Sequence, residues 1–244
     1  MNLENANLVP DPPDASNPPN VTGLTEDLAL ALLKRGDLPA EDIEQITKNA
    51  AVMQSRKVRL ALAAYPRAPR RIALRLIREL YTFDLMKFAL LPVVAADLKR
   101  TAEELLVARV ASITMGERIA LARRCSTLVA AALLLDKEPR VWQTALENPR
   151  LTESAIVKAL QRLQASASFV QAISRHTKWS VRPEIRMALL RNEHTPMARA
   201  LEFARRLPPA QLRDILHASR LPEKVKAYLR KELESHAPSR SPRR

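Results

Sequence analysis

The stretch from Val58 to Pro69 reads VRLALAAYPRAP, and the stretch from Ile185 to Pro196 reads IRMALLRNEHTP. Each begins with an apolar run that has alanine in fourth place, continues into a polar break and ends on proline. Because a proline disfavours the α region for the residue before it, a helix that begins such a stretch is expected to end at the break. A phrase of this kind that recurs predicts a repeated helical unit.

Two more copies of the phrase lie between these two, at Leu105–Gly116 and at Val141–Thr152, and a partial copy begins at Val225. The mean spacing of the four copies is about 42 residues, which is typical of helical repeats. After each break we expect a second helix, at residues 70–80, 117–124, 153–163 and 197–207. We expect a short third helix at residues 84–91, 127–135, 167–174 and 210–217. The fourth position of each phrase holds a small residue, which we expect to let a neighbouring helix come close: Ala61, Ala108, Thr144 and Ala188.

A unit of two or three helices cannot bury its apolar face alone, whereas stacked copies bury a continuous core. The period and the helix count over residues 48–234 resemble those of HEAT and armadillo α-solenoids. The resemblance implies an all-α fold, a right-handed α-solenoid of about four HEAT/armadillo-like helical repeats with N-terminal capping helices. An irregular helical bundle is the alternative. The chain has only three glycines, which also favours helices, because sheets with many tight turns need more.

The positions of prolines and glycines and the apolar periodicity predict four segments. Residues 1–22 hold five prolines and no apolar period, so we expect a disordered acidic lead. Residues 23–48 are expected to form capping helices broken at Gly36, with Arg35-Gly36-Asp37 as a helix stop rather than an adhesion motif. Residues 49–234 form the repeat domain in this interpretation, and residues 235–244 form a basic disordered tail.

Charge divides the chain unevenly. Residues 1–47 carry a net charge of −7 while the whole chain carries +14, so residues 48–244 carry +21. A basic body behind an acidic segment suits an anionic partner, either nucleic acid or an acidic protein. The alternative is that these arginines only solvate the outer faces of helices.

Cysteine content and the length of apolar runs indicate the compartment and the relation to membranes. The single cysteine, Cys125, cannot form an internal disulfide, which favours a reducing compartment. The longest apolar run, Leu128–Leu135, is far shorter than a membrane span. No secretory signal is visible at the N-terminus, so we expect a cytoplasmic protein without a membrane span.

The candidate binding residues are basic side chains and one tryptophan. The densest basic group surrounds the second helix of the first unit, and a smaller group lies on the first helix of the fourth unit. Trp142 is a candidate stacking platform for a base, with packing between helices as the alternative. The candidate residues are Arg67, Arg70, Arg71, Arg75, Arg78, Arg182, Arg186, Arg191 and Trp142.

No catalytic, cofactor or metal site is predicted. The four histidines lack the one-turn spacing of a helical metal motif, Glu193-His194 fits a surface loop, and three isolated glycines cannot form a phosphate loop. Arg123 and Arg124 directly precede Cys125, and their charge favours a lowered pKa of its thiol; the alternative, which we expect, is burial as a small apolar side chain.

Three functions remain. The favoured one is a non-catalytic binding module for an anionic partner, with nucleic acid first, and the second is a scaffold for protein partners with a groove between third helices. The third is an enzyme similar in gross architecture to HEAT-like alkylpurine DNA glycosylases, which would need an exposed tryptophan beside a carboxylate such as Asp84, Asp97 or Asp136.

Overall fold

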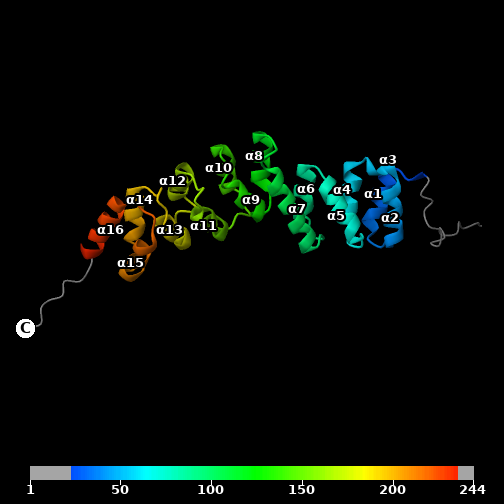
Figure 1. Ribbon diagram of the computed structural model, residues 1–244. Helices are drawn as coiled ribbons and strands as arrows, with labels where there is room; N and C mark the ends of the chain where they lie inside the picture. The colour runs from blue at the N-terminus through cyan, green and yellow to red at the C-terminus, as the bar shows by residue number, and fades with distance from the viewer. Residues whose placement is uncertain (1–22, 236–244) are drawn as a thin grey trace, which may run out of the picture.

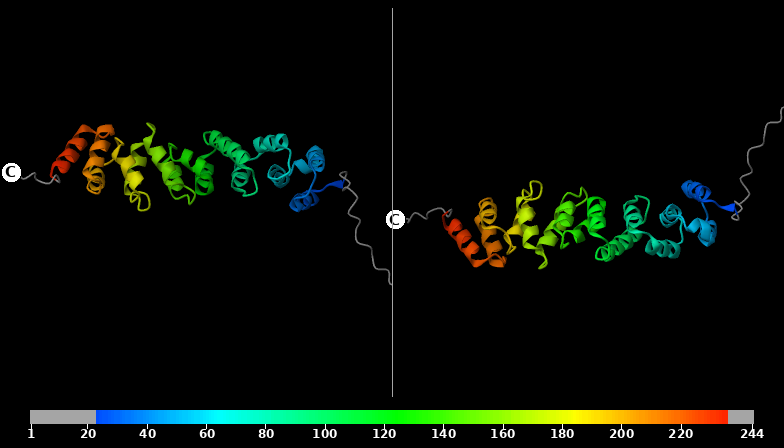
Figure 2. Two further views of the ribbon diagram at one scale, coloured as in Figure 1. Left: turned by 90° about the horizontal axis from the view of Figure 1, so that it is seen from below. Right: turned by 90° about the horizontal axis from the view of Figure 1, so that it is seen from above.

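The computed structural model describes residues 23–235, and every regular element in that part of the chain is a helix. The lead expected at residues 1–22 and the tail expected after residue 235 lie outside the described residues. The helices follow one another in an elongated row, with α1 at one end and α16 at the other (Figure 1). Figure 2 shows the same row from two further directions. The prediction of an all-α fold is confirmed.

The helices lie close to the positions that the repeated phrase predicts. The N-terminal helices are α1 (Glu26–Arg35), α2 (Ala40–Lys48) and α3 (Ala50–Met53). The next six are α4 (Arg56–Ala63), α5 (Arg70–Glu79), α6 (Thr82–Leu90), α7 (Ala96–Arg109), α8 (Met115–Arg124) and α9 (Thr127–Leu133). They are followed by α10 (Pro139–Leu146), α11 (Glu153–Gln161), α12 (Ala167–Arg175), α13 (Pro183–Leu190), α14 (Met197–Ala204), α15 (Pro209–Ala218) and α16 (Glu223–Ser235). Each expected first, second and third helix is therefore present.

Local chemistry explains several of the helix ends. Gly36 ends α1 with a φ of 76°, in the left-handed region that glycine tolerates best, which confirms the helix stop. Thr114 and Glu117 form a capping box at the start of α8, which satisfies backbone N–H groups that the first turn leaves free.

Packing runs between neighbours along the chain. Within residues 23–235, every pair of helices in extensive contact is at most three places apart in chain order. The buried apolar side chains nevertheless form one continuous cluster, from Leu24 before α1 to Leu229 in α16. The core therefore forms where each helix packs against its near neighbours in the chain. Repeat proteins that extend in one dimension bury apolar surface in the same way.

The residues that carry this packing differ in part from those expected. Of the small residues at the fourth phrase position, Ala188 is buried, but Ala108 is exposed and Ala61 and Thr144 are half-buried. The expectation of a close helix approach at every fourth position is therefore wrong. The first and fifth positions carry the core instead, because they lie on one helix face, and three of the four phrases bury them completely: Val58, Val141, Ile185, Leu62, Ala145 and Leu189.

Candidate functional site

The arginines of α5 project from an amphipathic helix. Its core face consists of four buried side chains, Ile72, Ala73, Leu76 and Ile77. The helical period places Arg71, Arg75 and Arg78 on the opposite face, and all three are exposed. The apolar spacing of this helix thus turns a row of cations toward solvent.

Three of the five predicted residues in this group already have partners. Arg70 is paired with Asp97, and Arg71 is paired with Glu44 of α2. Arg67 donates a hydrogen bond to the carbonyl oxygen of Asp37 at 3.3 Å. Both Asp37 and Glu44 belong to the acidic N-terminal segment, so that segment contacts the basic group directly.

Arg75 and Arg78 have no ion-pair partner among the described residues. Arg75, Arg71 and Lys48 line a hollow of about 360 Å³ between α2 and α5, together with Glu44, Thr47 and Ile72. We call it the α2–α5 hollow. Three cations and one carboxylate around one hollow attract an anion, and phosphate is a common protein ligand of this charge.

In the second predicted basic group, contacts within the fold hold Arg186. The Nε of Arg186 donates to the carbonyl oxygen of Ser180 at 2.8 Å, and its guanidinium lies 5.8 Å from the ring centroid of Phe203. Burial, followed by the nearby charge of Arg206, lowers the pKa of Arg186. Arg182 and Arg191 are exposed and have no ion pair among the described residues. Helices α5 and α13 lie far apart in the row, so the two groups do not form one patch (Figure 1).

Trp142 is not a surface residue. Its side chain is only 2% exposed and meets the ring of Phe169 edge to face, with ring centroids 5.7 Å apart. The stacking-platform interpretation is therefore wrong, and packing between α10 and α12 is its role. Trp179 is 3% exposed and donates from Nε1 to the carbonyl oxygen of Leu146 at 3.0 Å.

The carboxylates named for the glycosylase alternative are held by arginines. Asp84 accepts hydrogen bonds from Nε and Nη2 of Arg56 at 3.0 and 2.8 Å. Asp136 is bound by Nη1 of Arg118 at 2.9 Å. Paired carboxylates of this kind join neighbouring segments and need no substrate to explain their burial.

The cysteine and the histidines are also explained by packing and by contacts within the fold. Cys125 is fully buried, and this burial raises the pKa of its thiol to about 12. The interpretation of Cys125 as a buried side chain is confirmed, and burial disfavours its thiolate form in the folded protein. His176 pairs with Glu147 at 3.0 Å, and His194 lies in the loop between α13 and α14. Between residues 23 and 235, no group of three or more histidine, cysteine or acidic side chains is placed to hold a metal ion.

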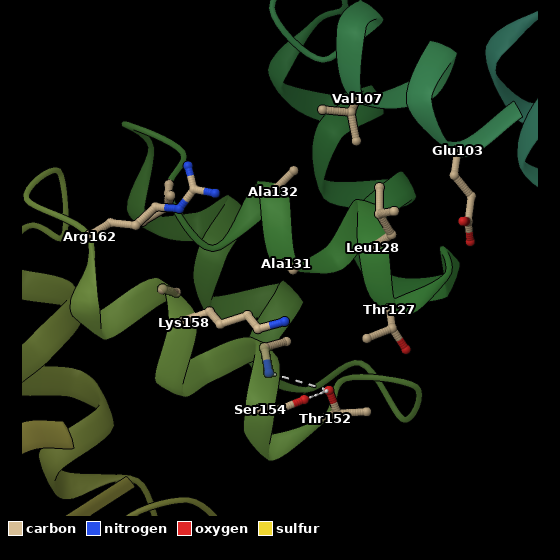
Figure 3. A pocket seen from close by; sticks show the side chains of 13 residues that line it. Glu103, Val107, Thr127, Leu128, Ala131, Ala132, Thr152, Ser154, Lys158 and Arg162 are labelled. Atoms are coloured by element: carbon tan, nitrogen blue, oxygen red, sulfur yellow. Dashed lines mark hydrogen bonds between the residues drawn. The ribbon is translucent and has the colours of Figure 1, made fainter. Parts of the chain in front are cut away.

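Sequence reasoning missed a second hollow, which is larger. It has a volume of about 690 Å³ and lies over α9, between α7 and α11 (Figure 3). We call it the α9 groove. Its floor is apolar, while Glu103 stands on one side and Lys158 and Arg162 stand on the other. The available signal is the apolar run Leu128–Leu135, which supplies the floor of this groove.

Sequence reasoning also missed the buried asparagines that link successive units. Asn148 is fully buried, and its Nδ2 donates to the carbonyl oxygens of Ala122 and Cys125 at 2.7 and 3.2 Å. Asn192 is 3% exposed and donates to the carbonyl oxygen of Leu160 at 2.8 Å. Both occupy the eighth position of the phrase, which is the signal that could have found them. Each satisfies the carbonyl end of a helix in the preceding unit.

Several arginines perform the same task. Arg109 donates to the carbonyl oxygens of Arg78 and Leu80 at 2.7 and 2.5 Å, and Arg150 donates to that of Arg124 at 3.1 Å. Arg199 donates to the carbonyl oxygen of Ser174 at 2.7 Å. A cation at a helix C-terminus is favoured by the helix dipole. Some of the arginines therefore stabilise helix ends of this fold rather than offering their charge to a partner.

None of the helices between residues 23 and 235 has the length and apolar character that crossing a bilayer requires. Comparisons of the chain with protein-family models, with curated proteins and with solved structures give no match.

Proposed function

We propose that the protein is a non-catalytic binding module whose basic surface engages an anionic partner, with nucleic acid as the favoured partner. Its scaffold is a right-handed α-solenoid of about four HEAT/armadillo-like repeats, capped by the helices of residues 23–48. The observation that carries the proposal is the α2–α5 hollow, where Lys48, Arg71 and Arg75 surround one concave site. Arg78, one turn after Arg75, extends the positive surface along α5.

The contacts of the acidic segment support this proposal. Glu44 already pairs with Arg71, so a carboxylate occupies a position that a phosphate oxygen would take. We infer that the acidic segment competes with the partner for this surface. Removal of the Glu44 charge should therefore strengthen binding, which a purely solvating role for the arginines does not predict.

The experiment is a fluorescence anisotropy titration with a labelled DNA duplex between about 50 and 200 mM salt. Phosphate contacts release counterions, so log affinity should fall linearly with log salt concentration. The double variant Arg75→Glu/Arg78→Glu should bind more weakly, with a slope smaller by about 2, and Glu44→Gln should bind more tightly. The matched control Lys158→Glu/Arg162→Glu makes the same change in net charge at the α9 groove.

Two outcomes would remove the proposal. One is the absence of binding at about 50 mM salt, where electrostatic association is strongest. The other is an equal loss in both double variants, because then only the total charge matters and α5 has no special part.

A protein-binding scaffold is the second candidate, and the α9 groove is the observation that favours it. An apolar floor between charged walls is the usual form of a site for a peptide segment. The glycosylase alternative receives no support, because both tryptophans are buried and the carboxylates of Asp84 and Asp136 are bound by arginines.

A further inference from the structure

Residues 128–135, which include all of α9 after Thr127, are apolar, and one side of this segment is fully buried. The buried side consists of Val129, Ala130, Leu133 and Leu134, each at most 1% exposed. The other side lines the α9 groove with a stripe of four residues at i, i+3, i+4 and i+7: Leu128, Ala131 and Ala132 of α9, and Leu135 in the turn that follows it. Leu128 is 41% exposed. Ala131, Ala132 and Leu135 are half-buried, so Leu128 is the member of this stripe that offers most of its apolar surface to a partner.

The walls of the α9 groove carry three charged side chains. Lys158 and Arg162 lie one turn apart at the end of α11, and both are exposed. Glu103 stands on the α7 side (Figure 3). Within the described chain these three side chains form no ion pair. These three charges are therefore available to side chains of opposite sign on a partner.

We propose that the α9 groove binds an amphipathic α-helix of a protein partner, with its apolar face on the α9 stripe and acidic side chains facing Lys158 and Arg162. This inference rests on the scaffold candidate and is independent of nucleic-acid binding at α5. The groove volume lies within the range of about 300 to 1,000 Å³ that is common for ligand sites. The stripe has the spacing that meets a second helix, and the alanines of α9 let that helix approach closely.

The charges on the two walls of the groove indicate which side chains the bound helix carries. Two cations on the α11 wall face a single carboxylate on the α7 wall, so acidic side chains are favoured along one flank and one basic side chain along the other. A second copy of this chain is a poorer fit. A twofold dimer through this site would place one groove against the other, so neither groove would receive a protruding helix.

The probe is a fluorescein-labelled synthetic peptide of about 16 residues, with leucines at i, i+3, i+4 and i+7 and glutamates along one flank. A control peptide keeps the leucines and carries lysine in place of glutamate. We expect saturable binding of the glutamate peptide by fluorescence anisotropy, and binding of the lysine peptide at least about tenfold weaker.

Protein variants separate the groove from general charge effects. Leu128→Asp, at an exposed position, and Lys158→Glu/Arg162→Glu should each weaken binding of the glutamate peptide by at least about tenfold. The matched control Arg75→Glu/Arg78→Glu should change it by less than about twofold while it weakens DNA binding, so the two proposals can fail separately. Circular dichroism at 222 nm confirms that each variant remains folded.

Three results would overturn the inference. The first is unchanged affinity in both groove variants. The second is displacement of the peptide by the DNA duplex with the groove variants defective for DNA, which would assign the α9 groove to nucleic acid. The third is a dimer in light scattering that Leu128→Asp converts to monomer, which would assign the groove to a second copy of the chain.

Discussion

Replacement of Asn148 by alanine tests how successive units are joined. The side chain is fully buried and makes four hydrogen bonds, three to the end of α8 and one within its own turn, and the weakest of them is to Cys125 Sγ at 3.7 Å. Its Nδ2 donates to the carbonyl oxygens of Ala122 and Cys125, and its Oδ1 accepts from the backbone N–H of Arg150 at 2.8 Å. The substitution leaves two carbonyl groups at the end of α8 without this donor.

The magnitude follows from these contacts. A buried hydrogen bond has a net value of about 1 kcal/mol, and a buried polar group left unpaired costs about 1–3 kcal/mol. We therefore expect Asn148→Ala to lower the free energy of unfolding by about 2–4 kcal/mol. Asn192→Ala removes fewer bonds and should cost less.

The assay is urea unfolding followed by circular dichroism, with the free energy obtained by linear extrapolation. Ser112 is the matched control, because it holds the same phrase position in the second unit but is exposed. Ser112→Ala should change the free energy of unfolding by less than about 0.5 kcal/mol. If Asn148→Ala falls within about 0.5 kcal/mol of this control, the asparagine does not join the units and the reasoning is wrong.

Further predictions concern single features of the fold. The pKa of the Cys125 thiol is raised to about 12 by burial, so we expect no reaction with a thiol reagent at about pH 8 in the native protein and full reaction in urea; rapid native reaction would show that the thiol is accessible. Gly36→Ala forces an alanine to a φ of 76°, where a new Cβ meets no atom within 4 Å, so the cost should be conformational, about 1 kcal/mol in urea unfolding, and an unchanged midpoint would mean that α1 ends differently. Hydrogen bonds from the backbone N–H and then the hydroxyl of Thr114 lower the pKa of Glu117. A lowered folded-state pKa stabilises the fold above the ordinary carboxyl pKa, and this stabilisation is lost as the pH falls through the folded-state value. The difference in unfolding midpoint between wild type and Glu117→Gln should therefore shrink between about pH 5 and about pH 3, and a constant difference would contradict it.

The sequence predicts the helices of this protein well because their signals are local. The proline after each break, the capping box at Thr114 and the glycine at position 36 act within one turn of the residue that carries them. The apolar period of α5 gives its buried face for the same reason. The repetition of one phrase then places helices of three kinds along the chain.

The functional surface could be predicted only in part, because charge on a sequence does not reveal its partner. Arg71 and Glu44 lie far apart in the chain, yet they pair where α2 meets α5. Arg150 and Arg199 donate hydrogen bonds to carbonyl oxygens at the ends of the earlier helices α8 and α12. Trp142 sits in a phrase position that elsewhere holds Arg59, Leu106 and Arg186, so the sequence does not decide whether it is buried, and the structure shows that it is.

The α9 groove was missed for a related reason. An apolar run such as Leu128–Leu135 shows that a segment is apolar on all sides, but not how many sides the neighbouring helices cover. That number depends on the spacing of α7 and α11 along the row, which is a property of tertiary packing. A groove of this kind is therefore visible only once the units are stacked.

Small-angle X-ray scattering of the full chain tests the central claim that these helices form an open row in which each contacts only its near neighbours. A compact single domain of this length would have a radius of gyration of about 18 Å. The row predicts a value well above about 18 Å and a distance distribution skewed toward long separations. A value near about 18 Å with a symmetric distribution would show instead that the helices pack into a globular bundle.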